Sequence, residues 1–140
     1  MRNIGIKVAM PKETCNDRKC PFHGSLSLRG QSFSGMVIST DVHRSATVEW
    51  ERRFYLQKYE RYEKRRSRVS AHNPSCINAK QGDLVTIYGC RPLSKTKHFV
   101  IVETIGKDIL FEQRQELIEE SKIKERRKEE LKTGAKKSEE

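Results

Sequence analysis

The chain has 140 residues, of which 34% are hydrophobic and 34% are charged, and its formal net charge is +10. Such a low share of hydrophobic residues predicts one modest domain accompanied by extended or unpacked segments. No apolar run approaches the length of a membrane span and no signal peptide is visible, which disfavours a membrane protein and a secreted one. We therefore expect a cytoplasmic chain whose four cysteines are reduced thiols or metal ligands.

The excess of positive charge is confined to residues 1–106, which hold 19 Lys/Arg and 9 Asp/Glu. Residues 107–140 hold 10 of each and are neutral. A charge that served only solubility would not need to divide in this way. The division indicates a domain that binds a polyanion, followed by a neutral appendage.

The first 32 residues predict an N-terminal arm and a loop that contains cysteines. Hydrophobic residues alternate with others in residues 1–8, which indicates an extended or strand-like arm. Residues 11–30 are rich in turn formers and include Cys15 and Cys20, which indicates a loop.

Two strands are predicted next, and together they indicate a hairpin. Phe33–Thr40 is a strand candidate in which Gly35 marks a bulge or bend. Ser45–Tyr55 resumes the β-branched and aromatic residues of a strand, and Asp41–Arg44 between the two is typical of a turn.

The segment Arg52–Arg68 carries eight Lys/Arg, four aromatic residues and only two acids. Cations neutralise phosphates, and aromatic rings and Arg planes stack on bases, so this mixture favours RNA as a partner. A solvated amphipathic helix is the alternative, because Tyr55, Tyr59 and Tyr62 have helical spacing. The candidate RNA-binding residues of the segment are Arg52, Arg53, Lys58, Tyr59, Arg61, Tyr62, Lys64, Arg65, Arg66 and Arg68.

The last strands are predicted at Leu84–Tyr88 and His98–Thr104, with a loop at Gly89–Lys97 between them. Counting the N-terminal arm, five short strands with long polar loops predict a small β-barrel, with its body in residues 33–106. From Asp108 onward, the spacing changes to that of a helix. Residues 107–140 therefore predict a charged helical tail, and we expect its end, from Lys132, to be disordered.

The segment GDLVTIYGCRPLSKTKHF (Gly82–Phe99) resembles the closing signature of the small-subunit ribosomal protein seventeen family. The blocks VHRSATVEWER, KYERYEKRRSRVSAHNP and CPFHGSLSLRG resemble its archaeal branch, and the resemblance covers roughly residues 1–105. It implies a mainly β fold, an OB-type five-stranded barrel with long basic loops that bind small-subunit ribosomal RNA. It also implies early binding to the 5′ domain of that RNA, neighbouring ribosomal proteins as partners, and no catalytic role. Gly89 departs from the glutamate that the family usually has there.

Further candidate RNA-binding residues lie in predicted loops and turns. In the RPLSKTK loop, Pro92 stiffens the backbone, while cations and hydroxyl groups suit phosphate and 2′-OH oxygens. The candidates of this loop are Arg91, Pro92, Ser94, Lys95, Thr96 and Lys97. Those elsewhere are His43 and Arg44 at the hairpin tip, Arg29, and His72, for which a role in the Asn73-Pro74 turn is at least as well supported.

Three residues with metal-ligand chemistry, Cys15, Cys20 and His23, lie on one loop. Structural zinc takes four ligands, so Cys76 or Cys90 would have to come near through the fold. The spacing is not that of a common zinc knuckle, and we therefore interpret the cysteines as small buried hydrophobic residues, with zinc as the alternative and no other cofactor.

Motifs of catalysis are absent from the sequence, which has no nucleophile elbow, Walker loop or HExxH helix. A Cys20–His23 nucleophile lacks a third group to orient it, so we expect neither an enzyme nor a small-molecule substrate. Three binding functions remain. They are a structural RNA-binding protein of the small ribosomal subunit, a free-standing OB-fold protein for single-stranded nucleic acid, and a zinc-stabilised module for protein partners.

Overall fold

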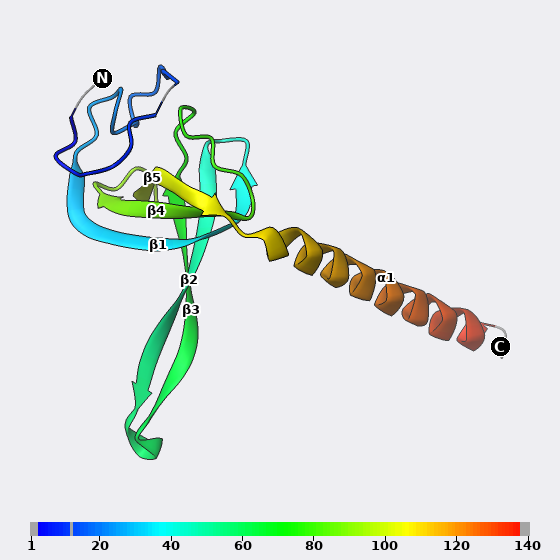
Figure 1. The fold of residues 1–140 in the computed structure, drawn as a ribbon. Coiled ribbons are helices and arrows are strands. Elements are labelled where there is room, and N and C mark those ends of the chain that lie inside the picture. Colours follow the sequence, from blue (N-terminus) through cyan, green and yellow to red (C-terminus); the bar gives the residue numbers. More distant parts are fainter. Residues whose placement is uncertain (1–2, 12, 138–140) are drawn as a thin grey trace. The chain divides into compact units, whose positions relative to one another are not determined.

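The computed structural model describes residues 3–11 and 13–137, and it divides the chain into two compact units, Met1–Asp108 and Ile109–Glu140. The first unit is built of β-strands and the second of one helix (Figure 1). The elements are β1 (Leu28–Asp41), β2 (Ser45–Leu56), the short 3-10 helix η1 (Gln57–Tyr59), β3 (Arg61–His72), β4 (Asp83–Cys90), β5 (Lys97–Lys107) and α1 (Ile109–Lys137).

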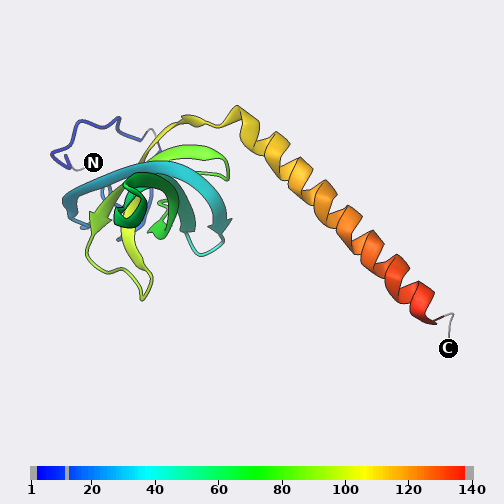
Figure 2. The ribbon, with the colours of Figure 1, turned by 90° about the horizontal axis from the view of Figure 1, so that it is seen from below.

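The five strands form a closed barrel in the order β1-β2-β3-β5-β4. Pairing of β1 with β4 closes the barrel, and all neighbouring strands are antiparallel except β3 and β5. The long strand β1 makes closure possible because it curves and pairs with β2 on one side and β4 on the other (Figure 2). The predicted OB-type barrel is therefore confirmed.

One of the five strands is not where the sequence predicted it. Residues 3–8 form no strand; Gly5 bends them with a left-handed φ of 75°. The fifth strand of the barrel is instead β3, which runs through the basic and aromatic segment and pairs with β2 along its whole length. The helical alternative for this segment is therefore wrong, apart from the short turn η1. In addition, β1 begins at Leu28, earlier than the predicted Phe33.

Two hydrophobic clusters hold the barrel unit together. The first fills the barrel and consists of Val37, Ala46, Val48, Ala71, Ala79, Val85, Ile87 and Ile101. The second joins the N-terminal loop to the barrel and consists of Cys20, Phe22, Leu26, Cys76, Cys90, Val100 and Val102. Burial of each large side chain among them contributes roughly 1.5–3 kcal/mol, so the loop is attached by packing although it has no strand of its own.

The second unit is the helix α1, whose sequence is dominated by charged residues. The helix continues to Lys137, whereas we expected disorder from Lys132; residues 138–140 lie outside the described part of the chain. Within the described residues, no helix is both long enough and apolar enough to cross a membrane.

Gly35 gives the first testable prediction, because β1 passes very close to β2 at this residue. A Cβ atom added there would lie 2.6 Å from the Glu49 carbonyl oxygen and 2.9 Å from Val48 Cγ1. The bulge that we expected at Gly35 lies instead between Val37 and Ser39. We expect Gly35→Ala to lower the free energy of unfolding by about 1–3 kcal/mol in urea denaturation, because the strands must separate to admit the methyl group.

Gly30 in the same strand is the matched control, since a Cβ atom there would meet nothing within 4 Å. Gly30→Ala should leave the stability unchanged or raise it by about 0.4–1 kcal/mol. Equal stabilities for the two variants would contradict the close approach of β1 and β2.

Candidate nucleic-acid interface

The β2–β3 ribbon, defined here as residues 51–66, projects from the barrel (Figure 1). The two strands pair from Ser45–His72 at the barrel to Leu56–Arg61 at the tip. The partners of β2 in β1 end at Glu49, and those of β3 in β5 begin only at Ser70. The ribbon is therefore a two-stranded structure without a third strand, and both of its faces are open to a partner.

The strand register places like charges directly opposite each other in the ribbon. Arg52 faces Arg65, and Arg53 faces Lys64. Like charges in such positions destabilise an isolated sheet. The ribbon holds seven basic and three acidic residues, so the repulsion is not balanced by its own acids. A polyanion would remove this repulsion.

Few of the cations have an acidic partner in the chain. Arg65 binds Glu63 at 2.9 Å, and Glu49 accepts both Arg66 and Arg68. Within the described part of the protein, Arg52, Arg53, Lys58, Arg61 and Lys64 form no ion pair. These side chains are exposed, and they are the ones most available to phosphate groups.

Exposed aromatic rings lie among these cations. Tyr55 and Tyr62 are cross-strand partners with ring centroids 5.2 Å apart, and Tyr59 at the tip is 63% exposed. Phe54, on the other face, lies under the Arg65 guanidinium at 4.0 Å. Phe54 and Tyr55 were not among the predicted site residues, because only the strand register shows that they share the faces of the cations.

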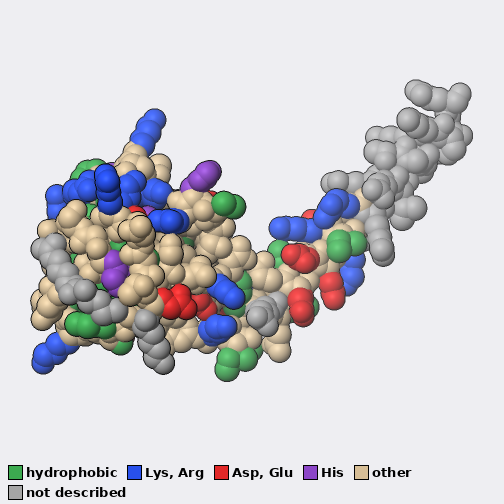
Figure 3. Space-filling model, turned by 90° about the horizontal axis from the view of Figure 1, so that it is seen from above, with side chains coloured by type: hydrophobic (Ala, Val, Ile, Leu, Met, Phe, Trp, Pro, Cys, Tyr) green, Lys and Arg blue, Asp and Glu red, His purple; other side chains and the backbone are tan. Residues whose placement is uncertain are grey.

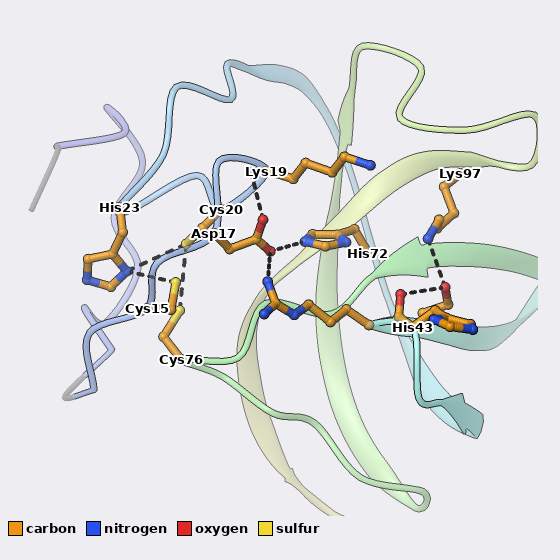
Figure 4. Close-up of polar contacts among 11 residues, drawn as sticks. Cys15, Asp17, Lys19, Cys20, His23, His43, His72, Cys76 and Lys97 are labelled. Atoms are coloured by element: carbon orange, nitrogen blue, oxygen red, sulfur yellow. Dashed lines mark hydrogen bonds and ion pairs between the residues drawn. The ribbon is translucent and has the colours of Figure 1, made fainter.

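Figure 3 shows one face of the barrel unit, on which Lys and Arg side chains gather in a broad patch. Two segments distant in the sequence meet in this unit. The Lys97 ammonium donates to the Ser45 hydroxyl at 2.8 Å, which joins the 91–97 loop to the β1–β2 turn that carries His43 and Arg44 (Figure 4). Of the sequence-predicted residues in the loop, Lys97 therefore lies beside the turn that carries His43 and Arg44.

The 91–97 loop is a tight turn with exposed side chains. The Leu93 N–H donates to the Lys97 carbonyl at 2.9 Å, and the Ser94 hydroxyl accepts the Lys97 N–H at 3.0 Å. Arg91, Pro92, Ser94, Lys95 and Thr96 are exposed. The hydroxyl of Ser94 is thus already used within the turn, while Arg91 and Lys95 stay exposed to a partner.

Arg29 extends this basic region along the adjoining strands. It is exposed at the start of β1, where Leu28 pairs with Cys90 of β4. Gly89 lies beside it: a Cβ atom at Gly89 would be 3.8 Å from Arg29 Cβ, an ordinary contact. With glycine at this position, residue 89 places no carboxylate beside Arg29.

His72 does not belong to the exposed surface, contrary to its place among the predicted RNA contacts. Its side chain is buried, and its Nε2 lies 2.7 Å from Asp17 Oδ2. Burial lowers the pKa of His72 by more than the Asp17 carboxylate raises it. His72 is therefore neutral near pH 7 and donates its Nε2 proton to Asp17, which is a structural role.

Asp17, which the sequence did not single out, organises this part of the molecule. It also forms an ion pair with Arg44 at 3.3 Å and accepts the Lys19 N–H at 2.9 Å (Figure 4). Burial raises the pKa of the Asp17 carboxyl, but its hydrogen bonds with the Lys19 N–H, His72 and Arg44 bring the pKa below its ordinary value. Asp17 thus links the N-terminal loop to Arg44, which has a left-handed φ of 53°.

The three candidate metal ligands Cys15, Cys20 and His23 come together, and Cys76 joins them. Their four ligand atoms lie within 4.8 Å of one another. Burial raises the pKa of the Cys20 and Cys76 thiols. Cys90 is buried in the hydrophobic cluster and does not belong to this group.

The closed five-stranded barrel, with its basic loops and projecting ribbon, defines the chain as an OB-fold protein with a cationic surface. A family model described as "Ribosomal protein S17" matches residues 35–103. Archaeal proteins named "Small ribosomal subunit protein uS17" are similar over most of their length. The chain is 52% identical to that of Methanocaldococcus jannaschii over 106 residues, which are 76% of this chain and 91% of the relative.

Two further relatives agree with this result. The Archaeoglobus fulgidus protein of the same name is 52% identical over 108 residues, 77% of this chain and 96% of the relative. The Methanoculleus marisnigri protein is 53% identical over 104 residues, 74% of this chain and 96% of the relative. The chain therefore belongs to the ribosomal protein S17 family and is of the archaeal type.

Proposed function

We propose that this protein is a structural constituent of the small ribosomal subunit that binds ribosomal RNA of the 5′ domain and aids its assembly. The names of its relatives support a place in the small subunit, and the family resemblance supports the 5′ domain. Its partners are then ribosomal RNA and neighbouring ribosomal proteins in the cytoplasm, and no catalytic step is involved.

The observation that carries RNA binding is the unbalanced charge of the β2–β3 ribbon. Arg52 and Arg65, and Arg53 and Lys64, oppose each other on a ribbon that has no third strand. These like-charged pairs are unfavourable in the isolated protein. Phosphates on both sides would turn the repulsion into attraction and release counterions.

The geometry suits a crevice between RNA helices. The ribbon is two strands wide, so it can enter between two phosphate backbones that would otherwise repel each other. The exposed rings of Tyr55, Tyr59 and Tyr62 offer faces on which unpaired bases can stack. The rigid 91–97 loop adds Arg91 and Lys95 as a second region of contact to phosphates and sugars.

A free-standing OB-fold protein for single strands is the alternative function. Such a protein presents aromatic rings on the barrel face. Here the barrel aromatics are partly buried and pack on one another: Phe33 stacks on Trp50 at 4.7 Å and meets Phe99 at 6.0 Å. The freely exposed rings lie on the ribbon instead, which favours folded RNA as the partner.

The ribbon cations give a direct test of RNA binding. Replacing Arg52, Arg53, Arg61 and Lys64 by Gln removes four exposed cations that have no ion pair among the described residues. We expect weaker binding to a 5′-domain RNA fragment and a salt slope flatter by up to about 0.9 for each phosphate that the variant no longer neutralises. The free protein should be as stable as the parent or more stable, because like charges are removed.

The matched control removes the same charge from other positions, by changing Lys107, Lys122, Lys124 and Arg126 to Gln. We expect this variant to keep most of the affinity. If both variants lose affinity equally, binding depends on net charge alone and the ribbon has no special role.

The 91–97 loop distinguishes the two nucleic-acid functions. Arg91 and Lys95 are exposed on a rigid turn that has no aromatic residue. Changing both to Ala should reduce affinity for folded 5′-domain RNA at least several-fold more than affinity for a single-stranded homopolymer, measured by filter binding at fixed salt. An equal or larger loss on the homopolymer would support the free-standing single-strand binder.

A further inference from the structure

Two segments that are far apart in the sequence bring four soft ligands to one point (Figure 4). Cys15, Cys20 and His23 lie on the N-terminal loop, and Cys76 lies on the loop between β3 and β4. Cys20 and Cys76 are 56 residues apart, yet their sulfur atoms are 3.7 Å from each other. We call these four residues the Cys–His cluster.

Three of the distances within the cluster match those of a tetrahedron around a metal ion, and all four ligand atoms lie within 4.8 Å of one another. With Zn–S bonds of about 2.3 Å and a Zn–N bond of about 2.05 Å, tetrahedral geometry separates two sulfurs by roughly 3.8 Å and a sulfur from a nitrogen by roughly 3.5 Å. The Cys20–Cys76 sulfur separation is 3.7 Å. His23 Nδ1 lies 3.3 Å from the Cys15 sulfur and 3.6 Å from the Cys20 sulfur.

The backbone around the cluster is shaped to hold these ligands. The Cys20 N–H donates to the Asp17 carbonyl at 3.1 Å, which closes a tight turn before the ligand. The Gly24 N–H donates to the Cys20 carbonyl at 2.9 Å. A Cβ atom at Gly24 would lie 2.4 Å from the Arg18 carbonyl oxygen, so the tight turn admits only glycine there.

The fourth ligand is also held by a fixed loop. Asn73 fixes the loop around Cys76, because its side chain accepts the Ala79 N–H at 3.1 Å and donates to the Ala79 carbonyl at 2.9 Å. The Ile77 N–H also donates to the Pro74 carbonyl at 3.1 Å. Both loops therefore present their ligands on fixed backbone, as a preorganised site requires.

We propose that the Cys–His cluster is a structural zinc site with a Cys₃His ligand set. Three thiolates and one imidazole are the ligands that zinc prefers in closed tetrahedral sites. A disulfide would join only two of the three cysteines and would not explain why the His23 imidazole lies beside them. Packing alone would explain buried cysteines, but not a histidine nitrogen directed at two sulfurs. This replaces our interpretation of these cysteines as small hydrophobic residues.

The zinc ion connects the N-terminal loop to the barrel and so to the basic surface. The loop forms no strand pairs, yet it supplies Asp17, which binds His72 and Arg44. Cys15 and Cys20 lie on either side of Asp17 in the sequence. Fixing these two residues therefore also fixes Asp17, and through it the position of Arg44 at the β1–β2 turn.

Metal analysis of the purified full-length chain tests the proposal. The protein is prepared under reducing conditions, and its zinc content is measured by native mass spectrometry and elemental analysis. We expect one zinc ion per chain in the parent protein. Cys76→Ser should weaken zinc binding more than about 100-fold. Mutation of a residue that only hydrogen-bonds to a zinc ligand already lowers metal affinity about 10–100-fold. Cys90→Ser, which changes a buried cysteine outside the cluster, should retain the zinc.

A measurement on the parent protein makes the result independent of how the variants fold. Cobalt(II) added to the zinc-depleted chain should give the visible absorption of a tetrahedral thiolate site, and zinc should displace it. Chelation should speed hydrogen exchange in residues 13–24 while β4 stays protected. Absence of both zinc and the cobalt spectrum, or a Cys20–Cys76 disulfide in the native protein, would overturn the proposal. Unchanged zinc affinity in Cys76→Ser would do so as well.

Discussion

Pairing between β2 and β3 is the interaction on which the rest of the structure depends. At the barrel end, Ala46, Val48 and Ala71 belong to the buried core, and β1 and β5 flank the pair. Beyond Glu49, the same ladder continues without neighbours. One continuous register therefore serves two purposes, because it builds the barrel wall and also directs the ribbon away from it. The barrel end of the β2–β3 pair is stable and supports the ribbon, whose like charges are unfavourable in isolation.

The ribbon illustrates how stability and binding compete in one element. Its like-charged cross-strand pairs and exposed tyrosines stabilise the free protein little, and only Arg65 and Arg66 among its described cations have acidic partners within it or next to it. This composition becomes favourable when phosphates supply the missing negative charge. The 91–97 loop follows a different design, in which internal hydrogen bonds fix the backbone and leave Arg91 and Lys95 exposed. The proposed RNA interface thus combines a ribbon whose charges need a partner with a preformed turn.

The N-terminal loop depends on side chains rather than on a strand. Phe22 and Leu26 share a buried cluster with Val100 and Val102, and the proposed zinc site would attach the loop at a second point. Asp17 then connects the loop to Arg44. A small barrel has a limited core, so additional side-chain contacts that attach a loop to it are expected in a chain with few hydrophobic residues.

Much of the barrel was predictable from the sequence because β2 and β4 alternate buried residues with less buried ones, while β1 and β5 carry short runs of β-branched residues. β3 was not, since its outer half lies on a ribbon with no buried face, where polar and aromatic residues hide the strand period. Residues 3–8 alternate but have no strand beside them to pair with. The site was predictable in part as well. The burial of His72 and the role of Asp17 depend on a contact across 55 residues. Only the fold shows that Cys76, and not Cys90, lies beside Cys15, Cys20 and His23. The RNA contacts themselves stay predictions.

We propose that RNA supplies the negative charge that the β2–β3 ribbon lacks. Hydrogen exchange measured by mass spectrometry, on the free protein and on its complex with a 5′-domain ribosomal RNA fragment, tests this most directly. We expect rapid exchange in residues 51–66 of the free protein, where no third strand protects the ladder, and strong slowing in the complex, while β4 is protected in both. A ribbon that exchanges at the same rate with and without the RNA would contradict RNA binding by the ribbon.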